Sequence, residues 1–571
     1  MNEEELKEHY KKHFDERDEQ TRAIVSLIDK GKRKVVVVAG PGTGKTTLFS
    51  KVLETKSGQT LTLSFVNALV NDLSLGLFGL SEVRTLHGFS TSFLKKKKIG
   101  ATIFPKLSNV IREDAQVLTG ESGIDFEKIF QEGEKDEEHL KFYKKRKDYY
   151  GNYYGYSDVV YALVKYFELE KHKKDIPTYD QIVVDEFQDF NQIEVALIDL
   201  LAEKSPILIA GDDDQSLYID LKGAKPKHIR DRHSDKKLGY ESPPLTYCSR
   251  STEVIVSAVN DFVKRAIKEG LLKGRVKKSY QYFPCKEMDS HGKKHSQIIF
   301  QPAYAKFLSP FFKEEISALA TIEKKKFEVL IIVPNALKKV RFPVIASALR
   351  KAGFKNINYS EATEKDLTYL DGFSLLIEEP ESNLGWRVLA QLMTEKSDLE
   401  SLLKETDTSP EKKVCEMVNK DCHEKVTRIL GTLKKILADE PVEHELIQEL
   451  LEVLGYDFAG VAVEKIKEVF YSKEFTSPEM RGVKDISITI TTILGSKGLA
   501  ADYVFLMDFS DKTFGKGKPT DQNAYDFIVA MTRARKRIYL VSPDDKEATF
   551  LHWIEKERVD KRSPFIRKLD E

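Results

Sequence analysis

The stretch VVVVAGPGTGKTT, residues Val35–Thr47, determines the fold prediction for this chain. It opens with four valines, and continuous β-branched runs of this kind are typical of strands buried in a parallel sheet. The rest matches the P-loop pattern, with alanine in the first glycine position and a helical segment after it. The backbone N–H groups of such a loop cradle phosphates. The pattern therefore predicts a nucleotide site in which Lys45 contacts the β- and γ-phosphates and Thr46 binds Mg²⁺.

Short apolar runs recur along the whole chain and alternate with segments of helical periodicity. This alternation predicts an α/β fold with parallel sheets. The runs are too many for one twisted open sheet, so we expect two sheets, one before about residue 245 and one after it. The expected central strands are Val35–Val38, Ile182–Val184, Ile207–Ile209, Val329–Val333, Ile486–Ile490, Tyr503–Met507 and Ile538–Val541.

The composition describes a folded protein with a heavily charged surface. Of the 571 residues, 41% are hydrophobic and 32% are charged, which excludes disorder as the main state. Lys and Arg total 91, as do Asp and Glu, so the chain is not a uniformly basic binder of polyanions. Residues 373–480 hold 23 acidic and 13 basic side chains, a net charge of −10, and the other 463 residues carry +10. Any polyanion would therefore be bound by local basic patches.

Cysteine usage and the character of the N-terminus indicate the cytoplasm. No apolar run reaches the ~18 residues of a membrane-spanning helix, and the N-terminus is charged where a signal peptide is apolar. The 4 cysteines show no CxxC spacing, which favours a reducing environment. We expect a cytoplasmic protein with no membrane partner.

Two regions interrupt the alternation of strands and helices and are expected to be mostly helical insertions. They are residues 95–176 and residues 373–482. The first contains the block KFYKKRKDYYGNYYGY, in which basic and aromatic side chains are interleaved. Such a block can guide a nucleic-acid strand. An exposed charged helix followed by a packed, tyrosine-rich turn explains it equally well.

Acidic residues follow two of the expected strands. Asp185 and Glu186 come directly after QIVV, at the carboxyl end of a strand, where ligands bind in parallel sheets. We expect Asp185 to hold Mg²⁺ and Glu186 to orient and deprotonate an attacking water, although an ordinary surface pair is the alternative. Another strand ends in GDDDQSLY, where three adjacent aspartates need hydrogen bonds or a cation to offset their repulsion. In the same segment, Gln215 can sense a γ-phosphate without adding charge.

Five motifs, taken in their order along the chain, resemble those of one helicase family. They are the P-loop, DEFQD at residues 185–189, GDDDQSLY at 211–218, GSKGLAADYVFL at 495–506 and VAMTRARKRIYLV at 529–541. The set is similar to the UvrD/Rep (PcrA-like) branch of superfamily 1 helicases, and the resemblance spans nearly the whole chain. It implies two RecA-like P-loop domains with parallel sheets, each carrying a mostly helical insertion. It also implies an ATP-dependent single-stranded DNA translocase or helicase of 3′ to 5′ polarity.

The resemblance implies a division of the chain into domains that are interrupted in sequence. The acidic insertion occupies the place of the family's 2B subdomain but is short, and the first insertion occupies the 1B position. The expected domains are 1–94 and 177–245 for the first RecA-like domain, 95–176 for the 1B-like insertion, 246–372 and 483–571 for the second RecA-like domain with a C-terminal tail, and 373–482 for the reduced 2B-like insertion.

The resemblance further implies a nucleotide site shared by both RecA-like domains, with ATP and Mg²⁺ as its ligands. Gln20 resembles the glutamine that reads adenine, while Arg250 and Arg533 resemble two arginines that the second domain directs at the γ-phosphate. Arginine fingers contribute roughly 10³–10⁵ in rate in related NTPases, so we expect these two to couple hydrolysis to domain closure. A solvated charge is the alternative for Arg533. The ATP contacts carried over from the P-loop are Gly40, Pro41, Gly42, Thr43, Gly44, Lys45, Thr46 and Thr47.

Contacts to a single strand are implied as well, with single-stranded or tailed duplex DNA as the partner. LTLSFVNALVNDL resembles motif Ia through Phe65 and Asn67, and VRTLHGFS resembles motif Ib through Thr85 and His87. Tyr218 is carried over as a further contact. Base stacking on aromatic rings contributes about 1–3 kcal/mol per base. A core aromatic is the alternative for Phe65, and a structural histidine is the alternative for His87.

Some positions depart from the family's pattern and motivate other functions. Ser249 stands where the family usually has a tyrosine that stacks on adenine, and Leu221 and Lys222 replace a base-stacking platform. In motif V, Leu494 and Ala500 stand in place of a histidine and a glutamate. One alternative is an ATP-gated clamp or sensor that works with a protein partner, such as a nuclease, on the acidic insertion. The other is an RNA remodeller, because stacking and phosphate contacts do not distinguish the sugars.

Overall fold

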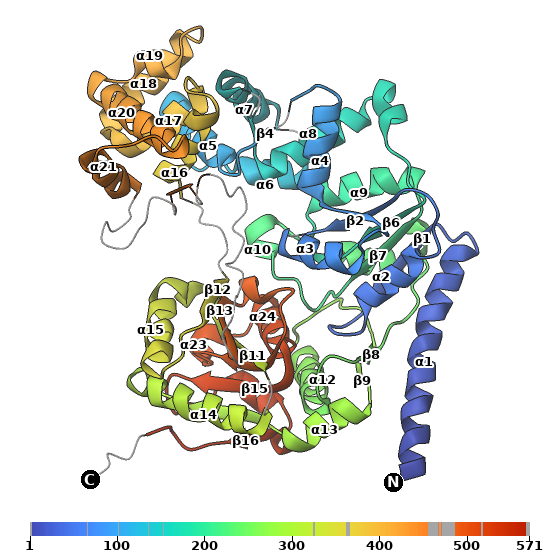
Figure 1. Cartoon of the computed structure of the whole chain (residues 1–571). Helices are drawn as coiled ribbons and strands as arrows, with labels where there is room; N and C mark the ends of the chain where they lie inside the picture. The colour runs from blue at the N-terminus through green and yellow to red at the C-terminus, as the bar shows by residue number, and fades with distance from the viewer. Residues whose placement is uncertain are drawn as a thin grey trace, which may run out of the picture. The chain divides into compact units, whose positions relative to one another are not determined.

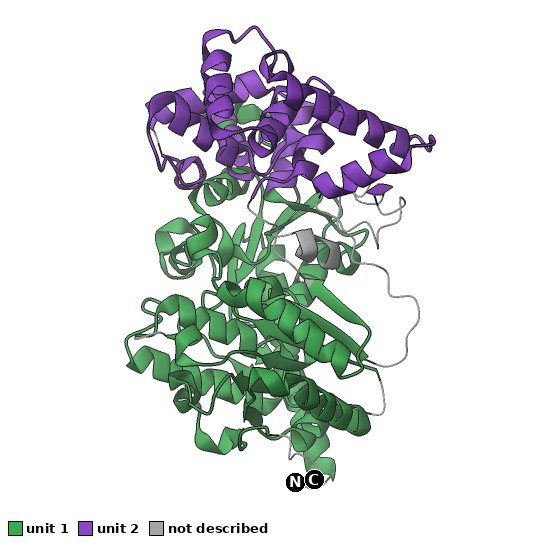
Figure 2. Ribbon diagram, turned by 90° about the vertical axis from the view of Figure 1, so that its left-hand side faces the viewer, with its two compact units in different colours: residues 1–86, 167–362, 480–571 green, residues 87–166, 363–479 purple. Residues whose placement is uncertain are grey.

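The computed structural model describes most of the chain, which forms two compact units (Figure 2). Unit 1 consists of Met1–Leu86, Phe167–Ala362 and Met480–Glu571, and unit 2 of His87–Tyr166 and Thr363–Glu479. The boundary expected at residue 482 lies outside the described residues. The described residues are 3–65, 67–100, 102–134, 136–151, 153–323, 326–360, 366–454, 466–467, 470, 486–515 and 518–566, without the side chains of 67–69, 71, 72 and 360.

The first half of unit 1, defined here as its part up to residue 245, is built on a 5-stranded parallel sheet in the order β1-β7-β6-β2-β3 (Figure 1). Because β7 lies between β1 and β6, the carboxyl ends of these strands are neighbours at one edge of the sheet. The strands are β1 (Lys34–Val38), β2 (Thr60–Ser64), β3 (Glu82–Thr85), β6 (Gln181–Val184) and β7 (Ile207–Gly211). The main helices are α1 (Glu3–Asp29), α2 (Lys45–Leu53), α3 (Asn67–Gly76), α9 (Gln192–Lys204), α10 (Ile219–Lys222) and α11 (Lys227–Ser234).

The core of this half forms because the strand side chains are almost entirely apolar. In β1, alternate valines such as Val35 and Val37 pack with Leu48 and Phe49 of α2 and with Leu208 of β7. Strands β6 and β7 are buried along their whole length, as expected for central strands covered on both faces. This rigid sheet holds the loops that follow its strands.

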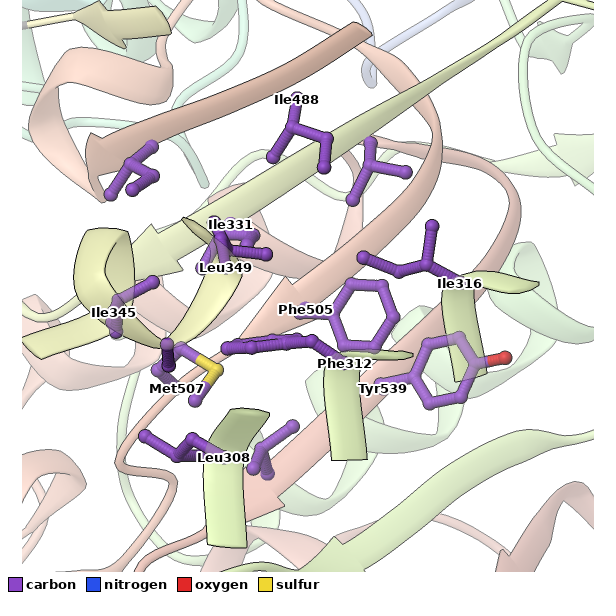
Figure 3. Close-up of a cluster of buried hydrophobic side chains, with 14 of the residues drawn as sticks. Leu308, Phe312, Ile316, Ile331, Ile345, Leu349, Ile488, Phe505, Met507 and Tyr539 are labelled. Atoms are coloured by element: carbon purple, nitrogen blue, oxygen red, sulfur yellow. The ribbon is translucent and has the colours of Figure 1, made fainter. Parts of the chain in front are cut away.

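The second half of unit 1, its part from residue 246 on, contains a 7-stranded parallel sheet in the order β12-β13-β11-β14-β15-β10-β16. Figure 3 shows one buried face, where Phe312 of α14 lies among Ile331, Phe505 and Tyr539 from the strands. The strands are β10 (Ile298–Pro302), β11 (Phe327–Val333), β12 (Ile357–Ser360), β13 (Ile486–Thr492), β14 (Ala501–Leu506), β15 (Ala534–Ser542) and β16 (Val559–Lys561). The main helices are α12 (Glu253–Lys268), α13 (Lys286–Lys294), α14 (Leu308–Glu323), α15 (Lys338–Lys351), α23 (Asp511–Phe514) and α24 (Asp521–Met531).

The predicted fold class is confirmed by these two sheets. Every apolar run expected to form a central strand lies in a strand of the expected sheet, although β14 ends at Leu506, one residue earlier than expected. A short parallel pair, β8 (Tyr247–Cys248) and β9 (Gln281–Tyr282), stands apart from both sheets. No helix among the described residues is both long and apolar enough to cross a membrane.

Unit 2 is almost entirely helical, as expected for both insertions. Its two stretches of chain share one core, in which Leu375, Leu384 and Val388 pack with Phe104 and Leu107. The insertions are therefore halves of one helical unit, although they are far apart in sequence. Apart from the short pair β4 (Thr102–Ile103) and β5 (Tyr153–Tyr154), the main elements are α4 (Leu86–Lys96), α5 (Leu107–Thr119), α6 (Phe126–Glu132), α7 (Glu137–Tyr150), α8 (Tyr156–Glu168), α16 (Tyr369–Glu378), α17 (Asn383–Met393), α18 (Lys396–Thr408), α19 (Val414–Met417), α20 (Lys420–Leu437) and α21 (His444–Leu454).

The basic and aromatic block of unit 2 forms α7 and the turn after it. Most of its aromatic rings are not available to stack on bases, which favours the packed-turn interpretation. The buried side chains are Tyr143, Arg146, Tyr150, Tyr153 and Tyr154. The exposed ones include Lys141, Lys144 and Lys145.

Candidate nucleotide-binding and catalytic site

The P-loop follows β1 and leads directly into α2. Gly42 and Gly44 have φ angles of +70° and +91°, in the left-handed region that favours glycine. The Lys45 ammonium donates to the carbonyl oxygens of Ala39 and Gly40, each at 3.2 Å, so it lies against its own loop. This strand–loop–helix unit has the form that binds phosphate at a helix N-terminus. The other predicted loop residues are Pro41, Thr43, Thr46 and Thr47, of which Thr46 and Thr47 are exposed.

Asp185 follows β6 at the sheet edge that also carries the P-loop. Its side chain is buried, and its Oδ1 has no hydrogen-bond partner within the described part of the chain. Burial, together with the nearby charge of Glu186, raises the pKa of Asp185 above its ordinary value. A divalent cation would offset both the missing partner and the raised pKa, so this carboxylate fits the predicted Mg²⁺ ligand.

Glu186 combines a strained backbone with a cationic neighbourhood. Its φ of +50° lies in the left-handed region, which costs a non-glycine residue about 1–3 kcal/mol. Its Oε2 accepts a hydrogen bond from Gln188 Nε2 at 2.6 Å, and the Lys497 ammonium lies 3.7 Å from the same oxygen. Burial opposes ionisation, but the charges of Lys497 and Lys45 outweigh it and lower the pKa of Glu186 below its ordinary value. The result is an ionised carboxylate, the form that can accept a proton.

Gln215 lies in the loop after β7 and contacts the second half of unit 1 directly. Its Nε2 donates to Asp212 Oδ2 at 3.0 Å, and its Oε1 accepts from Arg533 Nη2 at 3.0 Å. Its backbone carbonyl oxygen accepts from Lys497 Nζ at 3.0 Å. Burial and the nearby Arg250 guanidinium lower the pKa of Arg533 to about 10, so the group remains cationic at neutral pH. Two predicted site residues from different halves, Gln215 and Arg533, are therefore in contact.

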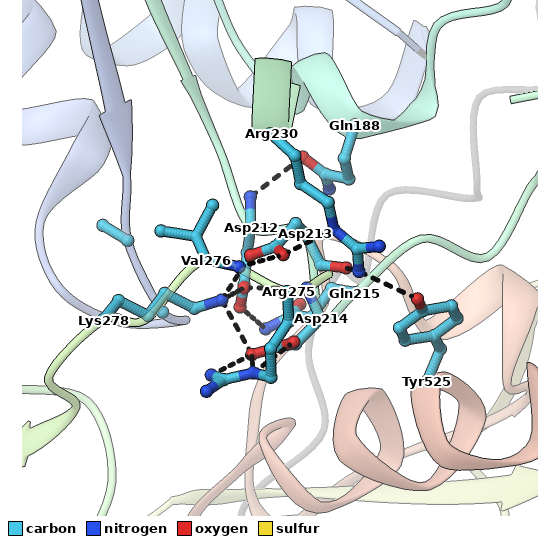
Figure 4. A network of polar contacts seen from close by, with 12 residues as sticks. Gln188, Asp212, Asp213, Asp214, Gln215, Arg230, Arg275, Val276, Lys278 and Tyr525 are labelled. Atoms are coloured by element: carbon cyan, nitrogen blue, oxygen red, sulfur yellow. Dashed lines mark hydrogen bonds and ion pairs between the residues drawn. The ribbon is translucent and has the colours of Figure 1, made fainter. Parts of the chain in front are cut away.

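The three aspartates Asp212–Asp214, here called the aspartate triad, are buried and neutralised by cations of the protein (Figure 4). Lys278 Nζ lies 2.6 to 2.9 Å from one oxygen of each aspartate. Arg275 binds Asp214 at 2.6 Å, and Arg230 binds the middle aspartate at 2.8 Å. The repulsion expected from the sequence is therefore offset mainly by one lysine and two arginines.

The second half of unit 1 also packs against the P-loop. The Ser249 N–H donates to the carbonyl oxygen of Gly42 at 3.0 Å, and a Cβ placed on Gly42 would lie 2.5 Å from the Cβ of Arg250. The Tyr280 ring lies 2.5 Å from where a Cβ on Gly40 would stand. Both glycines are therefore required by a close approach of the second half. Arg250, the second predicted arginine, reaches the loop through this contact.

Gln20 lies on α1 and pairs with Thr246 in the segment that joins the two halves. Its Nε2 donates to the Thr246 hydroxyl at 3.0 Å, and its Oε1 accepts from the Thr246 N–H at 3.0 Å. Both ends of the amide are therefore engaged. If Gln20 reads adenine, it has to exchange these bonds for bonds to the base.

The predicted strand contacts Phe65 and Tyr218 lie side by side and are both buried. Their ring centroids are 4.5 Å apart, and Phe190 lies 5.5 Å from Phe65. The Lys222 ammonium stands 4.4 Å from the Phe65 ring centroid, at one of the positions where the sequence departs from the family pattern. Stacking of a base on these rings would require the side chains around them to move.

The remaining predicted strand contacts are distributed over both units. Thr85 ends β3 in unit 1. His87 belongs to unit 2, where its ring centroid lies 4.9 Å from that of Tyr156. Asn67 is the first residue of α3, and its side chain lies outside the described residues. Thr85 and His87, which are only two residues apart in sequence, therefore belong to different units.

Comparison with known proteins identifies the family. Residues 20–220 match the model of a family described as an AAA domain, and residues 344–544 match the UvrD-like helicase C-terminal domain. DNA helicase II of Escherichia coli (strain K12) is 37% identical over 116 residues, which are 19% of this chain and 16% of that protein. DNA helicase II of Haemophilus influenzae is 36% identical over 115 residues, 19% of this chain and 15% of that protein.

The chain belongs to the UvrD/Rep-like superfamily 1 helicases. The two family matches cover parts of both halves of unit 1, in agreement with the order of motifs in the sequence. The chain spans less than a fifth of the length of the curated relatives that it matches.

For this UvrD/Rep-like chain, four residues near the site carried no predicted role. Lys497 lies inside the quoted GSKGL motif and forms a buried ion pair with Asp189. Its position inside a motif could have indicated a role at the site. Arg275, Lys278 and Tyr280 lie in a stretch that matches no quoted motif, and only the unbalanced charge of the aspartate triad pointed to cations somewhere in the chain.

Proposed function

We propose that the chain is an ATP-dependent single-stranded DNA translocase and helicase that hydrolyses ATP between the two halves of unit 1. The observation that carries this proposal is the hydrogen bond of Arg533 to Gln215, beside the P-loop and the two carboxylates. It joins a cation of the second half to the loop of the first half at the site where phosphates would bind. The names of the relatives, DNA helicase II, support DNA as the substrate class.

Binding of ATP would use the P-loop amides and Lys45, which would exchange its bonds to Ala39 and Gly40 for bonds to the β- and γ-phosphates. Thr46 and Asp185 would hold Mg²⁺, which neutralises charge on the phosphates when bound. The unpartnered Oδ1 of Asp185 supports this assignment.

Hydrolysis would use Glu186 as the base that orients and deprotonates water. The hydrogen bond that it accepts from Gln188 would orient the carboxylate. Arg533 and Arg250 would stabilise the charge that develops on the γ-phosphate. Gln215 would sense whether a γ-phosphate is bound. Because these groups come from both halves, hydrolysis and the contact between the halves would change together.

Translocation would follow from that coupling. Closure around ATP and opening after hydrolysis would move the strand contacts of the two halves relative to each other, with the 3′ to 5′ direction taken from the family. Phe65, Asn67, Thr85, His87 and Tyr218 are the proposed strand contacts. They are sequence-tolerant groups, which suits stepping along any base sequence.

The decisive experiment compares ATP hydrolysis with and without equal-length single strands of DNA and RNA. We expect stimulation by DNA, and loss of at least about 100-fold in Lys45→Ala, because the phosphate contact is removed. Lys51→Ala is the matched control, since Lys51 lies on the same helix but pairs with Asp18. An ATPase rate that does not change when DNA is added would contradict the coupling of hydrolysis to DNA binding. Stronger stimulation by RNA than by DNA would support the RNA remodeller instead.

A second assay separates a helicase from a clamp. The chain should displace the strand of a duplex with a 3′ single-stranded tail in the presence of ATP and Mg²⁺, and a 5′-tailed duplex is the control. DNA-stimulated hydrolysis without any displacement would support the ATP-gated clamp instead.

A further inference from the structure

The aspartate triad is bound by groups that lie in a different half of unit 1 from the triad itself. Lys278, beyond residue 246, lies 2.9 Å from Asp212, 2.6 Å from Asp213 and 2.7 Å from Asp214. Only 8% of its side chain is exposed. Burial disfavours the charged amine, but the three carboxylates outweigh this and raise the pKa of Lys278 above its ordinary value. One buried ammonium therefore stands at the centre of three carboxylates (Figure 4).

Neighbouring groups complete this arrangement. Arg275 Nη2 and Nε both donate to Asp214, at 2.6 Å and 3.0 Å, and the Val276 N–H donates to Asp213 at 2.8 Å. On the other side, Arg230 donates to Asp213 and to the Tyr525 hydroxyl, at 2.8 Å and 3.1 Å. The stretch 275–278 is thus fixed on the loop after β7 by side-chain and backbone contacts.

The triad is directly connected to the proposed catalytic groups through Asp212. Its Oδ2 accepts the hydrogen bond of Gln215 Nε2 at 3.0 Å, and Gln215 in turn accepts from Arg533. Its N–H donates to Gln188 Oε1 at 2.9 Å, and Gln188 holds Glu186 at 2.6 Å. Lys278 is therefore two contacts from Gln215 and three from Glu186.

We propose that Lys278, assisted by Arg275, is a positioning residue that holds the loop 212–215, and through it the Gln215 amide, in the geometry needed for ATP hydrolysis. The inference rests on the proposed function, since it assigns Lys278 to the machinery of that site. Lys278 acts through Asp212 and does not itself contact the reacting groups.

The buried charges of this loop favour a lasting anchor over a contact that breaks in each cycle. Three adjacent buried carboxylates repel one another, and removing the partner of a buried charge is strongly destabilising. The three aspartates form a group that could hold a metal ion, but the Lys278 ammonium already lies against one oxygen of each and offsets their charge. The two halves would accordingly move about this anchored stretch while the loop stays in place.

The first test measures amide hydrogen exchange of the segment 211–218 and needs no activity. Lys278→Met should speed exchange there, because the loop loses its central cation. Lys536→Met is the matched control: Lys536 is also largely buried and faces two carboxylates, Glu323 at 2.9 Å and Asp502 at 3.3 Å, and neither of these belongs to the loop. Equal exchange of 211–218 in wild type and Lys278→Met would overturn the inference.

The second test separates positioning from a merely structural role. In the DNA-stimulated ATPase assay, kcat of Lys278→Met should fall about 10–100-fold with KM for ATP within about twofold, because misplacing a catalytic group mainly affects the transition state. Lys536→Met should keep kcat within about twofold, and Lys278→Arg, which keeps the charge, should recover part of the loss. An unchanged kcat in Lys278→Met, or equal losses in both Met variants, would overturn the inference.

The outcomes distinguish the inference from the proposed function. A wild-type chain without ATPase activity contradicts the proposed function, while the exchange experiment still tests the anchor. If Lys278→Met does not fold, Lys278→Arg decides: a severalfold lower kcat at unchanged KM supports positioning, and a wild-type kcat refutes it.

Discussion

Two buried clusters of charges, one from each unit of this protein, are built in opposite ways. In unit 1, three adjacent aspartates share one lysine and two arginines. In unit 2, Arg146 and Arg387 share Asp114, each at 2.9 Å, with the Tyr150 hydroxyl as a further donor and Glu113 at 3.6 Å from Arg387. The first cluster collects carboxylates from one loop, and the second collects cations from two distant helices.

The difference indicates two different roles. The cluster of unit 2 joins α5 and α7 to α17, which belong to the two stretches of chain that make up that unit. Its partners among the described residues lie outside the predicted site, so we interpret it as a means of assembling the unit. The cluster of unit 1 continues through Gln215 to Arg533 and is part of the proposed catalytic arrangement. Substitutions should therefore affect activity at one cluster and stability at the other.

The largest effect on ATP hydrolysis is expected at Arg533, which is connected to the cluster of unit 1 through Gln215. Arg533→Ala removes the cation that contacts Gln215 and should lower kcat about 10³-fold or more, the range of arginine fingers in related NTPases. The measurement is DNA-stimulated ATP hydrolysis. Arg535→Ala serves as the control, because Arg535 is two residues away, is half exposed and pairs with Glu328. Comparable losses in both variants would show that the effect is not specific to the site.

The next effect is expected on stability, at the centre of the other cluster. Asp114→Asn leaves two buried arginines without their shared counter-ion and should destabilise unit 2 by about 3–5 kcal/mol. Denaturant unfolding, followed by a probe placed in unit 2, measures this loss. The ATPase rate per folded molecule should stay within about twofold of wild type. A large drop in kcat without loss of stability would remove the distinction between the clusters.

A smaller, pH-dependent effect is expected at Asp158 in unit 2. Burial raises its pKa from 3.8 to about 6, although Lys147 lies 3.0 Å away. At a pH between these two pKa values, the folded state holds the proton while the unfolded state has largely lost it. The free energy of unfolding therefore falls as the pH rises from about 4 to about 6 and then levels off. The change is at most about 3 kcal/mol, at 1.36 kcal/mol per pKa unit.

Unfolding of unit 2 measured from pH 4 to pH 8 checks this dependence. Asp158→Asn should flatten the fall in stability, because the titrating group is gone. Asp148→Asn, at an exposed position of α7, should leave the pH profile as it is in the wild type. A profile that stays steep in Asp158→Asn would assign the titration to another group.

The sequence was sufficient to predict those parts of the site that follow strands. Asp185, Glu186 and Gln215 come after apolar runs, and parallel strands bring their carboxyl ends to one edge, so the local pattern contained the geometry. The two sheets were predictable for the same reason. The roles assigned to these residues remain predictions that the experiments above test.

Other features depend on packing between distant stretches and have no local pattern. Lys278 lies 64 residues from Asp214, in a stretch that matches no quoted motif, so nothing near it in sequence indicates its partners. The common core of unit 2 joins insertions that are far apart along the chain. The burial of Phe65 against Tyr218 is a third case. The sequence pattern of an aromatic residue after a strand does not indicate whether the ring is buried or exposed.

The smallest effect we predict compares the arginines of the two clusters by conservative substitution. Arg275 donates hydrogen bonds to Asp214 from two nitrogens, Nε and Nη2. A lysine at this position keeps the charge but cannot form both hydrogen bonds in the same geometry. Arg275→Lys should therefore lower kcat only severalfold, since Lys278 still holds the aspartate triad, with little change in the free energy of unfolding. Arg146→Lys, which loses a comparable contact to Asp114, should do the reverse and lower stability while kcat stays unchanged. Kinetics and unfolding measured on both variants decide whether the clusters differ in role, because the chemical change is the same and only its place differs.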